Sequence, residues 1–117
     1  REGVKVALGS DIAGGDTLDM FDVIASTVRA SKARRIMDNW ETDFLTAAEG
    51  WYLGTSAGAS FFGAKPGVAV GEPLHALVLD DSALPPLSAP EDRLSRFLSR
   101  RQAGAVRAVW SAGRRVV

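Results

Sequence analysis

The residue best placed to do chemistry in this chain is Asp11, which closely follows an apolar run over residues 4–8. The run is apolar except for Lys5 and predicts a strand that is buried on both faces, as parallel strands are. Asp11 would then stand at the carboxyl end of that strand, where parallel α/β folds gather their catalytic groups. Its carboxylate is therefore a candidate catalytic group. The alternative is an acid that caps a turn through its side chain, which aspartate does often.

The residues that most often bind catalytic metals are scarce. The chain has one histidine, His75, and no cysteine, whereas a catalytic zinc site needs about three protein ligands. This chain cannot build such a site by itself, and we interpret His75 as a surface or rim residue of a turn. The chain also begins at Arg1 without an initiator methionine, so we expect it to be cut from a longer protein.

Composition restricts the classes of protein that fit the chain. Its 117 residues, 46% of them hydrophobic, are enough for one globular domain with a core. Basic and acidic residues number 14 each, so the net charge gives no reason to expect nucleic acid or an anionic membrane as a partner. The apolar runs are far shorter than the about 20 residues that cross a bilayer. Because cysteine is also absent, we expect a soluble, cytoplasmic protein.

Two helices are predicted in the first half of the chain. The first covers residues 17–37, with Asp16 at its N-cap and Asp19 three positions on, as in a capping box. The second opens at a Thr46 and Glu49 capping box and continues toward Gly63. Gly54 should let a neighbouring element approach closely. The apolar residues of the first helix recur at helical spacing and should face the core: Leu18, Met20, Phe21, Val23, Ile24, Ala25 and Val28.

The second half predicts strands around one helix. A strand is expected over residues 74–79, and a helix over 91–102 has Pro90 in its first turn. Two further strands, over 105–111 and 114–117, would form a hairpin through Ala112 and Gly113. The arginines that crowd this last quarter read mostly as solvated faces.

Two other patterns have ordinary structural explanations. Asp16, Asp19 and Asp22 recur every three residues, but their spacing matches no calcium loop, which favours helix capping and a solvated face over a cation site. The adjacent glycines Gly14 and Gly15 could offer free amides to a phosphate. The neighbouring carboxylates would repel that anion.

Five motifs, taken in order along the chain, resemble the C-terminal part of the amidohydrolase superfamily. They are Leu8-Gly9-Ser10-Asp11 with Gly14-Gly15, Leu45-Thr46-Ala47-Ala48-Glu49 leading to Tyr52-Leu53-Gly54-Thr55, Pro66-Gly67-Val68-Ala69-Val70-Gly71-Glu72, Leu77-Val78-Leu79-Asp80, and Val109-Trp110-Ser111-Ala112-Gly113-Arg114-Arg115-Val116. They span nearly the whole chain. Within the superfamily, the helix over 91–102 and the basic strand that follows are most similar to guanine deaminases.

The resemblance implies an α/β fold, the C-terminal portion of a (β/α)8 TIM-type barrel. Residues 1–67 would supply the last barrel strand and the helices after it, and residues 68–117 would supply strands of a small accompanying β-sandwich with one helix. It also implies hydrolysis of guanine to xanthine and ammonia at a zinc or iron ion. Asp11 matches the family's metal-site aspartate and would be both ligand and proton shuttle. Gly14 and Gly15 would let the loop approach a purine substrate closely.

The chain departs from the family pattern, and two hypotheses remain open. It lacks the family's His-x-His and later metal-binding histidines, so alone it should bind no metal and be inactive. Pro73-Leu74-His75 also stands where the family usually has a Lys-x-Ala-Asp type of segment. The leading hypothesis is a C-terminal fragment whose partner is the N-terminal part of the enzyme. The alternative is a stand-alone, non-catalytic module or subunit that acts through self-association or barrel complementation. Unpaired strand edges and uncovered helix faces predict a homo-oligomer in either case.

Overall fold

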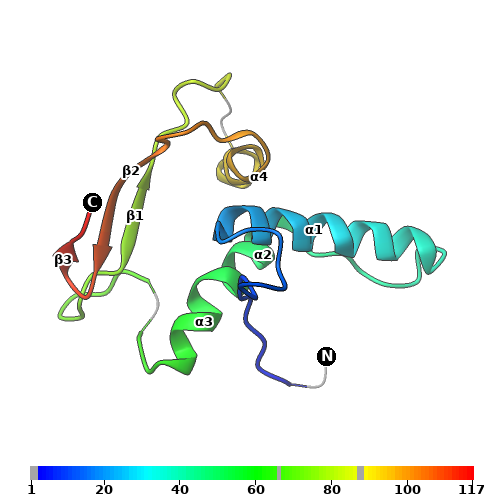
Figure 1. Ribbon diagram of the computed structural model, residues 1–117, viewed down its shortest axis with the longest axis horizontal. Helices are drawn as coiled ribbons and strands as arrows, with labels where there is room; N and C mark the ends of the chain where they lie inside the picture. Colours follow the sequence, from blue (N-terminus) through cyan, green and yellow to red (C-terminus); the bar gives the residue numbers. More distant parts are fainter. Residues whose placement is uncertain (1–2, 66, 87–88) are drawn as a thin grey trace.

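Helices and strands alternate only in the second half of the chain (Figure 1). The computed structural model describes residues 3–65, 67–86 and 89–117. Within them the elements are, in order, α1 (Met20–Met37), α2 (Ala47–Gly54), α3 (Ser56–Phe61), β1 (Ala76–Leu79), α4 (Pro90–Arg100), β2 (Val106–Ser111) and β3 (Arg114–Arg115). Figure 1 places the sheet to one side of the helices.

The apolar core lies where α1 meets α2 and α4. Ile24 is 1% exposed and forms a cluster with Ala25 of α1 and Leu98 of α4. The ring of Phe21 lies 5.8 Å from that of Trp51 and 5.6 Å from that of Phe97, which joins all three helices. The predicted burial of Ile24 and Ala25 is confirmed. This core fixes the direction in which α1 leaves the loop that carries Asp11.

The first turn of α1 differs from the prediction. The helix begins at Met20, and Asp19 is its N-cap, with its Oδ1 accepting a hydrogen bond from the Phe21 amide at 2.9 Å. Thr17 Oγ1 in turn accepts from the Asp19 amide at 3.0 Å. The expected cap at Asp16 is therefore wrong. Leu18 precedes the helix and is 67% exposed, so its predicted place in the buried stripe is wrong as well.

The second predicted helix is two helices. The capping box of Thr46 and Glu49 is confirmed, with both reciprocal hydrogen bonds present. Thr55 then has φ −131° and ψ −87°, which no helix accommodates, and the chain bends there into α3. The predicted close approach at Gly54 is confirmed, because a Cβ atom on this residue would lie 2.6 Å from the Ile24 side chain.

The strand predicted over residues 4–8 is not formed. This segment has no regular secondary structure, and the Leu8 amide donates instead to the Leu53 carbonyl of α2 at 3.0 Å. Val4 and Val6 are 73% and 54% exposed. A strand exists only through hydrogen bonds to a neighbouring strand, and within the described residues this segment lies against helices. The predicted burial of this segment on both faces is therefore wrong within the described residues.

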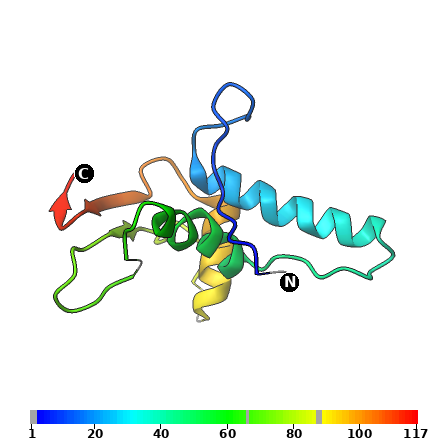
Figure 2. The same cartoon turned by 90° about the horizontal axis from the view of Figure 1, so that it is seen from below.

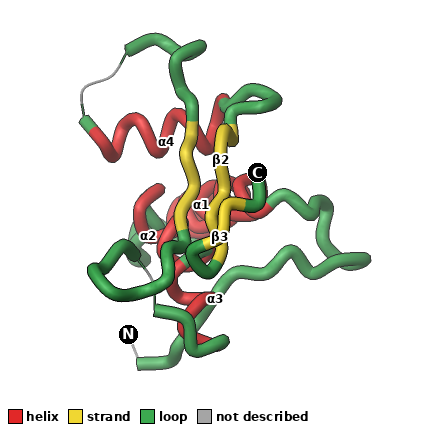
Figure 3. Tube along the Cα trace, turned by 90° about the vertical axis from the view of Figure 1, so that its left-hand side faces the viewer, coloured by secondary structure: helices red, strands yellow, loops and turns green. Residues whose placement is uncertain are grey.

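The three strands form one antiparallel sheet in the order β1-β2-β3. Figure 3, which looks onto the sheet, shows β1 and β2 side by side, and Ala76 pairs with Trp110. The predicted hairpin between β2 and β3 is confirmed, with Ala112 at φ 50° and Gly113 at φ 78°, the left-handed conformations of a tight hairpin turn. The strands are shorter than predicted. The described residues contain this one sheet and no second one facing it.

The molecule exposes more surface than a compact protein of its mass. Its accessible area is 8579 Å², whereas about 6,100 Å² is expected for a compact monomer of this mass. The Cα radius of gyration, 15.5 Å, also exceeds the about 13 Å of a compact domain of similar length. Figure 2 shows why: α1 projects on one side and the sheet on the other. None of the described helices is long and apolar enough to cross a membrane.

Candidate functional site at the Asp11 loop

Asp11 begins a tight turn between the extended segment and α1. Its carbonyl oxygen accepts hydrogen bonds from the amides of Gly14 at 2.9 Å and Gly15 at 2.5 Å. Asp11 has φ 48° and Ala13 has φ 77°. Positive φ is uncommon for residues other than glycine, and aspartate adopts it more readily than alanine does. The turn therefore holds the backbone of Asp11 in one defined conformation.

The carboxylate of Asp11 is exposed and lies over the same turn. A Cβ atom on Gly14 would stand 2.7 Å from Asp11 Oδ2, so the missing side chain at this position makes room for the carboxylate. Grooves of about 440, 460 and 940 Å³ run over the described residues, and Asp11 lines none of the three. Figure 2 shows the loop projecting beyond the helices. Asp11 is thus presented outward rather than into a cavity formed by this chain.

The residues that the structure describes do not complete a metal site. Among them, no three histidine, cysteine, aspartate or glutamate side chains stand together in an arrangement that could hold an ion. A catalytic metal needs about three protein ligands, and Asp11 offers one carboxylate.

The glycine at position 15 is required by the turn. A Cβ atom there would collide with the Ser10 carbonyl oxygen, which is backbone and cannot rotate away. We expect Gly15→Ala to lower the free energy of unfolding by about 1–3 kcal/mol, as overpacking does. Gly9→Ala is the matched control, since nothing lies within 4 Å of the added methyl group. Urea unfolding of both variants measures the difference, and equal midpoints would contradict the assigned role.

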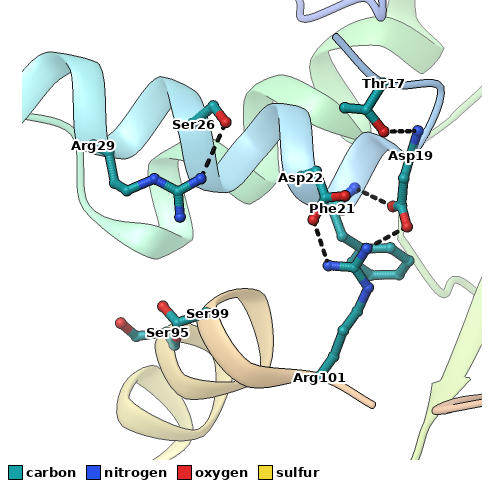
Figure 4. Close-up of polar contacts among 9 residues, drawn as sticks. All are labelled: Thr17, Asp19, Phe21, Asp22, Ser26, Arg29, Ser95, Ser99 and Arg101. Atoms are coloured by element: carbon teal, nitrogen blue, oxygen red, sulfur yellow. Dashed lines mark hydrogen bonds and ion pairs between the residues drawn. The ribbon is translucent and has the colours of Figure 1, made fainter. Parts of the chain in front are cut away.

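A part-buried arginine stands at the other end of this loop (Figure 4). Arg101 follows α4, and its side chain is 17% exposed. One guanidinium nitrogen pairs with Asp19, the N-cap of α1, and the other with Asp22 at 2.9 Å. The guanidinium also lies 5.1 Å from the centre of the Phe21 ring. These contacts join Arg101 to residues far away along the chain: Asp22 precedes it by 79 positions and Asp19 by 82 positions.

The arginine changes the acid strength of its partners. The hydrogen bond from Arg101 lowers the pKa of Asp22 below its usual range, against an opposing effect of burial, and the charge of Arg29 adds to the lowering. The pKa of Arg101 is raised in return, mainly by the hydrogen bond to Asp22. Asp22 and Arg101 therefore both stay charged near neutral pH.

Hydrogen bonds and a neighbouring arginine also lower the pKa of Asp80, a carboxylate beside the sheet. The pKa of Asp80 lies well below its usual range because Ser82 donates hydrogen bonds to it and Arg107 pairs with it at 2.8 Å. A carboxylate whose folded pKa is depressed stabilises the fold fully above its unfolded pKa, about 3.9, and loses that contribution as the pH falls through the folded value. Stability should thus decline as the pH falls below about 4.

We expect Asp80→Asn to flatten that decline. The variant should be less stable than the wild type at pH 7, and the difference should narrow as the pH falls from about 4 toward 2, since protonation removes the same interaction. Asp16→Asn, at an exposed aspartate of the Asp11 loop, is the control and should follow the wild type. Thermal unfolding followed between pH 7 and 2 measures the effect. A difference in stability between the wild type and Asp80→Asn that stays constant from pH 7 to pH 2 would contradict the explanation.

Sequence reasoning missed Arg101. The sequence pattern favoured a solvated face for it and its neighbours, whereas the structure leaves it 17% exposed and pairs it with Asp19 and Asp22 at the start of α1. The signal that could have found it is the uneven charge: acids crowd residues 11–22 and arginines crowd the last quarter. For Asp19 the expected helix capping is confirmed, and the Asp19 and Asp22 side chains are 41% and 50% exposed while both pair with Arg101.

The remaining candidate residue, His75, is exposed. Its Nδ1 accepts a hydrogen bond from the Ala112 amide at 3.5 Å, in the hairpin. It also lines the 460 Å³ groove, together with Trp51 of α2 and Trp110 of β2. The structure does not bring His75 and Asp11 into a common groove. The interpretation of His75 as a rim residue fits this position.

Comparisons with known proteins found a solved structure that is similar over nearly the whole of this chain. No protein-family description and no curated protein match the chain. Among solved structures, the chain is similar to a guanine deaminase from C. acetobutylicum, described with guanine bound in its active site. The two are 33% identical over 98% of this chain, with a TM-score of 0.84. The chain spans 28% of the length of that protein.

This likeness defines the class of fold. The helices and the small antiparallel sheet of this chain have the arrangement of part of a guanine deaminase, and a TM-score of 0.84 over 98% of the chain leaves almost no residue outside the match. The chain is therefore guanine-deaminase-like in structure and in sequence. The resemblance drawn from the five sequence motifs is confirmed at this level.

Proposed function

We propose that this chain is the C-terminal part of a metal-dependent amidohydrolase that deaminates guanine. The observation that carries the proposal is the 33% identity and TM-score of 0.84 over nearly all of this chain to 28% of a guanine deaminase. In the proposed enzyme, residues 3–8 become the last barrel strand and Asp11 stands at its carboxyl end. Residues from about 68 onward belong to the accompanying β-sandwich.

The geometry of the Asp11 turn supports a functional role. Residues held at positive φ without being glycine store strain, and such strain gathers at active sites. Here Asp11 and Ala13 both have positive φ within one turn. The apolar segment before them lies uncovered, with Val4 and Val6 exposed. Neighbouring barrel strands would cover this segment, and the carboxylate at its end would then face the mouth of the barrel.

The proposed reaction replaces the exocyclic amine of guanine by oxygen. Water adds to the ring carbon that bears the amine, and the carbon–nitrogen bond then breaks, so guanine and water give xanthine and ammonia. Asp11 takes a proton from the attacking water and delivers it to the departing amine, which leaves as neutral ammonia. A zinc or iron ion bound in the complete enzyme lowers the pKa of water toward neutrality. Asp11 would be one of its ligands, and the others lie outside this chain.

The exposed apolar surface supports the proposal that another part of the enzyme packs against this chain. A groove of about 940 Å³ runs between the extended segment and the helices. Its lining includes Val4, Val6, Tyr52 and Phe61, and each of these side chains is more than half exposed. Large contiguous apolar surfaces on a protein mark places where another chain segment packs. We assign the N-terminal part of the same enzyme to this groove.

The decisive experiment is to read and express the coding region upstream of Arg1. The proposal expects an in-frame continuation that encodes a His-x-His motif at the end of a predicted strand, and expects the complete protein to convert guanine to xanthine. This chain alone should show no turnover and bind no zinc. A stop codon followed by a start signal upstream of Arg1, or a complete protein that leaves guanine unchanged, would contradict the proposal.

A second candidate function is favoured by the same exposed surface. A stand-alone module or subunit would use the apolar groove and the unpaired extended segment to associate with itself or to complete a barrel made by another polypeptide. Sedimentation of this chain across a range of concentrations separates the two. A stable, defined homodimer that buries the groove and needs no upstream segment would favour the module over the fragment.

A further inference from the structure

The loop that carries Asp11 is fixed at both of its ends by contacts from distant parts of the chain. At its start, the Leu8 amide donates to the Leu53 carbonyl. At its end, Asp19 caps α1 with one carboxylate oxygen and pairs with Arg101 through the other. Between these points the chain makes the turn in which the Gly14 and Gly15 amides donate to the Asp11 carbonyl.

The end held by Arg101 is built from an unusual residue set. A guanidinium has a planar array of donors and can bind two carboxylates at once, and its flat face stacks on aromatic rings. Arg101 does all of these, with Asp19, Asp22 and Phe21 as its partners. Figure 4 shows the side chain reaching from the end of α4 across to the first turn of α1. A lysine could contact only part of this set.

Arg101 shares its low exposure with Arg96, which is 14% exposed and pairs with Asp81, and differs from the exposed arginines of the last quarter. The side chain of Arg101 is 17% exposed, whereas that of Arg107, which pairs with Asp80 on β2, is 64% exposed. Exposed ion pairs contribute about 0–1 kcal/mol. The Arg101 cluster is only part-buried, with the Asp19 and Asp22 side chains 41% and 50% exposed, and removing Arg101 leaves both carboxylates without their counter-charge. One of them is Asp19, the residue at which the Asp11 loop joins α1.

We propose that Arg101 is a positioning residue for Asp11, so that the C-terminal part of the chain controls the geometry of the catalytic loop. Arg101 holds the first turn of α1 through Asp19 and Asp22, and this anchors the C-terminal end of the loop. The catalytic consequence rests on the proposed function. The structural consequence, a loop held in place from the C-terminal part of the chain, does not.

The first test measures the loop directly in this chain. Amide hydrogen exchange at Gly14 and Gly15 reports the turn, because both amides bond to Asp11. In Arg101→Met the exchange of both amides should become at least about tenfold faster. The loop can then open without first breaking the Arg101 contacts. Arg101→Lys should give an intermediate rate. Arg107→Met, which removes an arginine from an exposed pair in the same part of the chain, should leave both rates unchanged.

The second test measures turnover in the complete enzyme. Arg101→Met should lower kcat for guanine about 10-fold to 100-fold, because displacement of a catalytic group by about 1 Å has effects of this size. KM should change less than kcat, and Arg101→Lys should restore part of the loss. Should the wild-type enzyme not act on guanine, the proposed function fails while the exchange experiment still decides the positioning role.

Two results would overturn the inference. One is unchanged exchange at Gly14 and Gly15 in Arg101→Met, even if the melting temperature falls, since Arg101 would then stabilise the helices alone. The other is a guanine turnover in that variant equal to the wild type. If Arg101→Met does not fold, Asp22→Asn decides, because it removes one ion pair and leaves the Asp19 cap intact. Unchanged exchange in Asp22→Asn would then overturn the proposal.

Discussion

Replacing Asp11 by asparagine is expected to lower guanine turnover by the complete enzyme about 10²-fold to 10⁴-fold, the contribution of a general acid–base group. Asparagine has nearly the same shape, so the turn should survive: its hydrogen bonds run from the Gly14 and Gly15 amides to the backbone carbonyl at position 11. What disappears is the ability to accept a proton. Loss of guanine absorbance and release of ammonia measure the change.

The matched control for this experiment lies in the same loop. Asp16 is exposed, like Asp11, but falls after the turn and caps no helix, because Asp19 has that role. Asp16→Asn removes the same charge and should turn over guanine at the wild-type rate. Equal loss in both variants would mean that the loop needs negative charge in general. Near-normal turnover in Asp11→Asn would remove Asp11 from the catalytic role.

The largest expected effect on stability is at Ile24. Its side chain is 1% exposed at the centre of the α1, α2 and α4 contact. Ile24→Ala should lower the free energy of unfolding by about 2–5 kcal/mol, through lost burial and the cavity left behind. This is a large share of the about 5–15 kcal/mol that holds a typical domain together. Urea or thermal unfolding measures it.

The same helix supplies the control. Ile36 is 61% exposed near the end of α1, and Ile36→Ala removes the same atoms from a site that faces water. Its effect should stay within about 0.5 kcal/mol. Similar losses in both variants would contradict the core as described and would indicate that the far end of α1 is covered in solution.

The parts of the fold that were predictable depend on short-range chemistry. The capping box of Thr46 and Glu49 and the hairpin turn at Ala112 and Gly113 involve residues that are neighbours in sequence, and both are confirmed. The choice of Asp19 over Asp16 as the cap of α1 was not predictable in this way. Both are aspartates, and Asp19 is the one that also meets Arg101.

The candidate site was likewise predictable only in part. The sequence pointed to Asp11 and to its glycine pair, and the structure brings these residues into one turn. The role of Asp11 in catalysis stays a prediction, since the chain forms no complete metal site within the described residues. The strand before it could not be judged from its own residues. An apolar pattern indicates that a segment favours burial. It does not indicate whether neighbouring strands are present to pair with that segment.

The sequence by itself determined which segments become helices and hairpins and which residue types gather around Asp11, because helix caps, turns and apolar periodicity act over a few residues. The tertiary structure alone decided that Leu8 is hydrogen-bonded to α2, that Thr55 breaks a helix, and that Arg101 reaches Asp19 and Asp22. Those outcomes depend on contacts between residues far apart along the chain, whose free energy no local pattern records.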